Sequence, residues 1–179
     1  MTTKFTASAP EAQVIGSTVL SYLNCIEQES IAPILARYVE GDVQPDVWYP
    51  HQTLLNVLRD IDKGDSNVSS SMVSIGVQIM DEGELPPTIR TIPDILNALG
   101  VVYHMYHRNV AEPGWTAVPM GEHKIRLIHD SPYPNDLAYG IVWSSVRRFV
   151  PAGWQFRVLQ SEPEHPNDAV YFDVEWGPA

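Results

Sequence analysis

The sequence predicts an α+β protein in which a helical N-terminal half packs on a four-stranded antiparallel sheet. Apolar residues recur at helical spacing from residue 11 to 108, whereas from residue 115 to 176 most of them alternate with polar residues. At 179 residues with 44% hydrophobic content, the chain is long enough for one domain around one core. We therefore predict a single domain over 11–179, preceded by a flexible arm at 1–10 that is rich in Thr, Ser and Ala.

Five helices are predicted in the N-terminal half. Their apolar residues keep a helical period over four stretches: 11–39 (two helices), 50–61, 68–80 and 92–108. Pro50 suits the first turn of its helix, and Gly76 indicates close packing against a neighbouring element. Thr91–Asp94 supplies a cap, a proline and an acidic residue, which together are typical of a helix start.

The C-terminal half is predicted to have the order strand, strand, helix, strand, strand. The alternating stretches are 115–120, 123–129, 154–159 and 170–176. Gly121 suits the hairpin between the first two strands, and Asn135 suits the cap of a helix that ends before Pro151. The polar stretch 161–168 is expected to be a solvent-facing turn.

Charge and composition exclude several kinds of partner. The formal net charge of -11 repels phosphate backbones, so we predict no nucleic-acid partner. No apolar run reaches the ~18 residues of a membrane span and the start does not resemble a signal peptide, which predicts no membrane partner and a cytoplasmic location. The single cysteine, Cys25, has apolar neighbours and is expected in the core.

Several local strings resemble a known superfamily. They are Ile92-Pro93-Asp94 opening a helix, the helix that begins near Asn135 behind a strand, and Trp154–Val158 leading through polar residues into 170–176. Over residues 49–176 this order resembles the haem nitric-oxide/oxygen-binding (H-NOX) superfamily, which also includes four-vinyl-reductase-like small-molecule domains. The resemblance implies an α+β ligand-binding or sensory module.

The same resemblance implies where a haem would bind. Family members that bind haem use a histidine on the long helix before the sheet and a Tyr-x-Ser-x-Arg motif that grips the propionates. The helix position is nearest to Tyr103 or His104, and the motif position is occupied by His129-Asp130-Ser131-Pro132-Tyr133. Tyr133 in place of arginine removes a bidentate cation and Asp130 adds a negative charge, so we predict no haem cofactor. The alternative is a haem-dependent gas sensor that uses His104.

Other chemistry finds little support in the sequence. His104 and His107, joined by His123 or His129, lack the acidic partner and second anchor of a recognised metal motif, so we predict no metal. The adjacent pairs His129–Asp130 and Glu164–His165 are expected at turns or strand ends. No nucleophile motif or phosphate-binding loop is present, so we predict no catalytic residue.

Aromatic residues near the helix–sheet boundary predict a pocket between the helices and the sheet. We expect it to be lined by Tyr103, Tyr106, Trp115, Tyr133 and Tyr139. The predicted function is a haem-free small-molecule-binding or sensory module, in which the ligand shifts helix 93–108 relative to the sheet. The further alternative is a structural or protein-interaction domain that forms a homodimer or binds a signalling protein.

Overall fold

The computed structural model describes residues 2–26, 28–63, 72–161 and 168–179. The fold is α+β, as predicted. Its N-terminal part contains, in order, β1 (Gln13–Ile15), α1 (Gly16–Asn24), α2 (Gln28–Leu35), β2 (Trp48–Pro50), α3 (His51–Asp62) and α4 (Met72–Glu82). The remainder contains α5 (Ile92–Tyr106), β3 (His107–Arg108), β4 (Gly114–Gly121), β5 (Lys124–Asp130), α6 (Asn135–Phe149), β6 (Trp154–Gln160) and β7 (Val170–Pro178).

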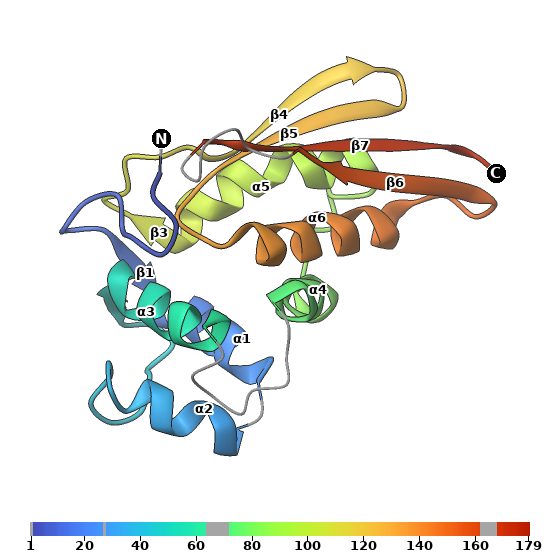
Figure 1. Ribbon diagram of the computed structural model, residues 1–179. Coiled ribbons are helices and arrows are strands. Elements are labelled where there is room, and N and C mark those ends of the chain that lie inside the picture. Colours follow the sequence, from blue (N-terminus) through green and yellow to red (C-terminus); the bar gives the residue numbers. More distant parts are fainter. Residues whose placement is uncertain (1, 27, 64–71, 162–167) are drawn as a thin grey trace.

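The larger sheet has four antiparallel strands in the order β4-β5-β7-β6, which confirms the predicted sheet and its strand, strand, helix, strand, strand sequence. Helices α5 and α6 lie on one face of this sheet, and α4 lies beyond α6 (Figure 1). Leu127 of β5 pairs with Phe172 of β7, so both side chains point to the same face of the sheet. That face is covered by these helices, and both side chains are fully buried. The opposite face carries paired charges, such as Arg126 with Asp173.

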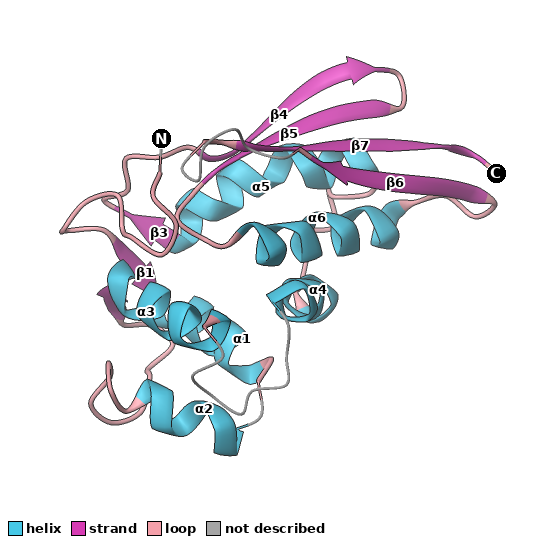
Figure 2. Ribbon diagram, viewed as in Figure 1, coloured by secondary structure: helices cyan, strands magenta, loops and turns pink. Residues whose placement is uncertain are grey.

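A smaller sheet was not predicted. Its strand order is β2-β1-β3, with β1 paired antiparallel to both neighbours (Figure 2). The prediction of helix was therefore wrong at residues 13–15, and the helix predicted over 92–108 ends at Tyr106. Strands of two or three residues are too short to show a period of two, and they are stabilised by pairing with segments far away in sequence.

Helix starts were predicted with mixed success. Thr91 and Asp94 form the expected capping box, in which each side chain accepts a hydrogen bond from the other residue's backbone N–H. Pro50 lies one residue earlier than predicted, at the N-cap of α3. Pro134 is the N-cap of α6, so the prediction that Asn135 caps this helix was wrong, and no side chain caps it.

Helices α4 and α6 cross at two glycines. A Cβ added to Gly76 would lie 2.2 Å from the carbonyl oxygen of Leu137, and one added to Gly140 would lie 2.2 Å from that of Val73. The close packing predicted at Gly76 is confirmed. Part of the helix predicted over 68–80, namely 68–71, lies outside the described residues, and so does most of the turn predicted over 161–168.

Two clusters of buried apolar residues form the interior. One involves α1 to α4, together with Tyr103 and Tyr133, and the other fills the space between the four-stranded sheet, α5 and α6. Cys25 is buried in the first, as expected. Within the part of the chain that the structure describes, no helix is long and apolar enough to cross a membrane.

Candidate functional site

Five aromatic side chains from distant parts of the chain meet where the helical half adjoins the sheet half. They come from α1, α3, α5, β3 and the loop before α6, and each is at most 7% exposed: Tyr22, His51, Tyr103, His107 and Tyr133. Ring centroids are 4.8 Å apart for His51 and His107, 5.3 Å for His51 and Tyr133, 4.2 Å for Tyr103 and His107, and 5.5 Å for Tyr22 and Tyr133. We call these five residues the junction cluster.

His107 is held in one tautomer. It caps the C-terminal end of α5 in an extended conformation, which turns its ring inward instead of along the helix. Its Nδ1 lies 2.8 Å from the Tyr103 carbonyl oxygen, which can only accept, so Nδ1 carries the hydrogen. Nε2 therefore accepts the hydrogen bond that the Tyr133 hydroxyl donates over 2.7 Å. Burial lowers the pKa of His107 to about 4, so the ring is neutral at pH 7.

His51 has no such partners. Its ring is fully buried, and neither ring nitrogen has a hydrogen-bond partner among the described residues. Burial, with a smaller contribution from His107, lowers its pKa to about 3. A buried polar group left unpaired costs about 1–3 kcal/mol, so the orphaned imidazole makes His51 a candidate functional residue.

Glu112 extends the cluster toward the surface. This carboxylate is 5% exposed and lies in the loop between β3 and β4. Its Oε1 accepts a short hydrogen bond from the Tyr103 hydroxyl, whereas Oε2 has no partner among the residues that are described. Burial and the adjacent Glu112 raise the pKa of Tyr103 well above its usual range, so this hydroxyl remains a donor.

A second polar group lies at the end of β5. The Lys4 ammonium donates to the Ser131 carbonyl oxygen over 2.9 Å and lies 3.5 Å from Nδ1 of His129. Because an ammonium has no acceptor, Nδ1 is the unprotonated nitrogen and Nε2 donates to the Ser131 hydroxyl over 2.7 Å. Burial lowers the pKa of His129, and Lys4 lowers it further. Burial also lowers the pKa of Lys4 to about 8.

Residues 2–8, part of the predicted flexible arm, lie over the end of β5 and the loop that follows it. The Thr2 hydroxyl donates to Asp130 over 2.5 Å, and the Phe5 backbone N–H donates to the Pro132 carbonyl over 2.7 Å. The side chain of Gln52, on α3, donates to the Phe5 carbonyl and accepts from the Ala7 N–H, both over 2.9 Å. The arm thus joins the helical half to the sheet half.

A cleft of about 310 Å³ lies between this arm and the β3–β4 loop. We call it the arm cleft. Its polar lining consists of two carboxylates and four hydroxyl side chains: Glu112, Asp130, Thr2, Thr3, Thr6 and Ser8. Glu112 therefore connects the arm cleft to the junction cluster through Tyr103.

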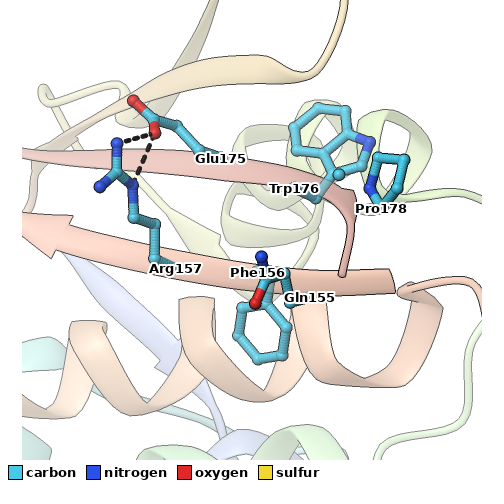
Figure 3. A pocket seen from close by; sticks show the side chains of 7 residues that line it. Gln155, Phe156, Arg157, Glu175, Trp176 and Pro178 are labelled. Carbon is cyan, nitrogen blue, oxygen red and sulfur yellow. Dashed lines mark hydrogen bonds and ion pairs between the residues drawn. The ribbon is translucent and has the colours of Figure 1, made fainter. Parts of the chain in front are cut away.

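A second hollow, of about 380 Å³, lies on β6 and the end of β7 (Figure 3). Arg157 and Glu175 face each other across it as an ion pair, and Phe156 points to α6, where it packs against Trp143. Its charged side chains are thus already paired, whereas in the junction cluster the His51 nitrogens have no partner among the described residues.

The five residues predicted to line one pocket are divided between three places. Tyr103 and Tyr133 are together in the junction cluster, with ring centroids 6.4 Å apart. Trp115 and Tyr139 both contact Phe172 in the sheet core, with ring centroids 6.1 and 6.4 Å from that of Phe172. Tyr106 is 42% exposed and lies outside both groups.

The sequence did not point to His51 or Glu112, and it placed His107 inside the helix predicted over 92–108. No motif surrounds His51 or Glu112, so only the fold reveals their burial. The histidines considered as metal ligands lie apart: His104 is exposed, and His123 stacks on Trp176. Over the described ranges, no group of three or more His, Cys, Asp or Glu side chains could hold a metal ion.

The arrangement of elements defines the H-NOX fold. No family model matches the sequence, and no curated protein matches it either. Solved structures do match, and those described below are H-NOX proteins or domains.

The matches to individual structures each cover most of both chains. An unliganded Fe(II) H-NOX mutant from K. algicida has a TM-score of 0.68 and 13% identity, and the match covers 91% of this chain and 96% of that one. An H-NOX protein from S. oneidensis in the Fe(II)NO state has a TM-score of 0.66 and 13% identity, covering 91% and 99%. An oxygen-bound H-NOX domain related to soluble guanylate cyclases has a TM-score of 0.66 and 16% identity, covering 91% and 93%. The predicted resemblance is confirmed for the fold.

The residues present do not fit the haem arrangement that the resemblance implies. His104 is exposed on α5, while its inward neighbour Tyr103 is bound to Glu112. Tyr133, at the motif's arginine position, is buried and bonded to His107. Lys4 is a cation near Ser131. Its charge is already offset by Asp130, which raises the pKa of Lys4 against the lowering by burial. The rings of Tyr103, His107 and Tyr133 pack against one another, with centroids 4.2 to 6.4 Å apart.

Proposed function

We propose that this protein is a haem-free sensory module that binds a small molecule and detects it through the junction cluster. The observation that carries the proposal is His51, a fully buried imidazole with both nitrogens unpaired, in contact with His107 and Tyr133. A ligand, or a rearrangement caused by one, that paired these nitrogens would recover part of the free energy lost by their burial.

The position of the cluster supports a role in signalling. Tyr22 and His51 belong to helices of the N-terminal half, whereas His107 follows α5 directly and Tyr133 lies in the loop between β5 and α6. A change in the packing of these rings therefore alters how α1 and α3 contact α5 and the loop before α6. Ligand binding would then shift α5 relative to the sheet by favouring one of two packings.

Native mass spectrometry and thermal unfolding across a metabolite panel test the proposal. We expect a retained organic molecule or a ligand-dependent rise in Tm, and we expect His51→Phe to abolish either. The matched control is His104→Ala, which changes an exposed histidine on α5 and should respond to the ligand as the native chain does. No bound molecule and no stabilisation across the panel would contradict the proposal.

Haem titration tests the haem-free part separately. The native chain should remain without a Soret band because His104 is exposed and the motif position lacks the tyrosine and the arginine. A band that disappears in His104→Ala would instead establish the alternative gas sensor, and a band that disappears in His107→Ala would show that the junction cluster opens for haem.

A further inference from the structure

We propose that the arm cleft binds a small organic cation through a primary ammonium group, with Glu112 as its charge partner. This inference rests on the proposed function, because it names the class of ligand that the module detects and the place where that ligand enters.

The lining of the arm cleft selects for positive charge. Its polar groups are the carboxylates of Glu112 and Asp130 and four hydroxyls, and no cationic side chain lines it among the residues that the structure describes. The nearby Lys4 does not line the cleft, but it donates to the Ser131 carbonyl and partly offsets the charge of Asp130, which leaves Glu112 as the main charge partner. A primary ammonium is a compact charge with three donors, which matches carboxylate and hydroxyl acceptors.

Glu112 provides a second observation, separate from the lining of the cleft, that points to a ligand. The residue is only 5% exposed, and one of its two carboxylate oxygens has no hydrogen-bond donor within the described part of the chain. Burying a charge without a partner is costly, and the Tyr103 hydroxyl satisfies Oε1 alone. An ammonium group in the cleft would satisfy Oε2. The net charge of -11 also raises the local concentration of cations.

The size of the cleft limits the ligand. A volume of about 310 Å³ is at the lower end of ligand pockets, so it admits small metabolites and excludes large ligands. The hydroxyls of Thr2, Thr6 and Ser8 lie around the same space, so a ligand that carries its own hydroxyl would gain hydrogen bonds. A short amino alcohol combines these features.

Tyr103 connects this site to the junction cluster. Its hydroxyl binds Glu112, its ring stacks on His107 at 4.2 Å, and its carbonyl fixes the His107 tautomer. Gly114 approaches the same ring so closely that an added Cβ would lie 2.5 Å from it. An ammonium that pairs with Oε2 reduces the negative charge at Oε1 and so weakens the hydrogen bond that holds Tyr103. The ring can then move only by displacing its neighbours.

Isothermal titration calorimetry with ethanolammonium chloride tests the inference, at constant ionic strength. Ethylene glycol is the neutral control and sodium acetate the anionic one. We expect saturable binding of ethanolammonium alone, weakened at least tenfold in Glu112→Gln. The matched variant Glu122→Gln removes one carboxylate from the exposed β4–β5 turn and should bind as the native chain does. Asp130→Asn, on the other wall, should also weaken binding and serves if Glu112→Gln does not fold.

Absence of saturable binding to the native chain would overturn the inference, as would equal affinities of the native, Glu112→Gln and Asp130→Asn chains. The proposed function has a separate outcome. If ethanolammonium does not bind but another metabolite stabilises the chain in a His51-dependent manner, the sensory module stands and the ammonium site falls. If ethanolammonium binds through Glu112 and His51→Phe leaves every ligand-induced Tm shift unchanged, the site stands and the role of the junction cluster falls.

Discussion

On the outer face of the sheet, charged side chains lie in pairs, whereas in the junction cluster and at the adjoining Glu112 buried polar atoms lack partners. Arg126 forms two hydrogen bonds with Asp173, and Glu175 contacts both Lys124 and Arg157. His51 and one oxygen of Glu112 have no such contacts within the described residues. Exposed pairs add little stability because water already solvates them, but a buried unpaired group costs free energy.

The α4–α6 crossing offers the largest expected effect and shows what a fully packed region tolerates. In Gly140→Ala the new methyl group would meet the Val73 carbonyl at 2.2 Å, so the helices must separate. We expect a loss of about 3 kcal/mol in the free energy of unfolding, measured by urea denaturation. Gly177→Ala, which has nothing within 4 Å, is the control. Equal stability of the two variants would show that the crossing is loose.

Two histidines of the junction cluster should respond to the same substitution with opposite signs. His107→Phe leaves the Tyr133 hydroxyl without its acceptor and should lower the free energy of unfolding by about 2 kcal/mol. His51→Phe keeps a ring and removes two unpaired nitrogens, so it should raise that free energy by about 1 kcal/mol. Chemical denaturation of both variants checks this, and destabilisation by His51→Phe would refute the claim that its nitrogens are unsatisfied.

The same histidines predict a pH dependence. Their folded-state pKa values, about 3 for His51 and about 4 for His107, lie below the unfolded value of ~6.5. Between pH 6.5 and 5 the unfolded chain therefore binds protons that the folded chain does not, and stability falls as the pH falls. Each histidine contributes up to about 1.4 kcal/mol per pH unit. Urea unfolding at several pH values should show this slope, reduced in His51→Phe; a flat profile would mean that water reaches these rings.

The smallest effect is expected on the outer face. Arg157→Gln breaks an exposed ion pair with Glu175, which keeps Lys124 as a partner. We expect a change in the free energy of unfolding within experimental error. A large loss would mean that the charge network of the sheet supports the fold, and the contrast with the junction cluster would weaken.

Local sequence determined most of the sheet half. The strands show an alternation that depends only on neighbouring residues, and α5 begins at a capping box within four residues. The departure from the haem motif at Tyr133 could likewise be found from the sequence, because it rests on residue types at a fixed spacing.

Tertiary structure decided the site. The pairing of β1 with β2 and β3 ends α5 before His107 and directs that ring inward, while α3 places His51 beside it. Glu112 is buried in a loop that lies against the N-terminal arm, where the Ala111 N–H donates to the Ser8 hydroxyl. These contacts join residues dozens of positions apart, and no local period records them. The sequence by itself therefore determined the H-NOX-like frame, and long-range packing determined which polar groups it leaves unpaired.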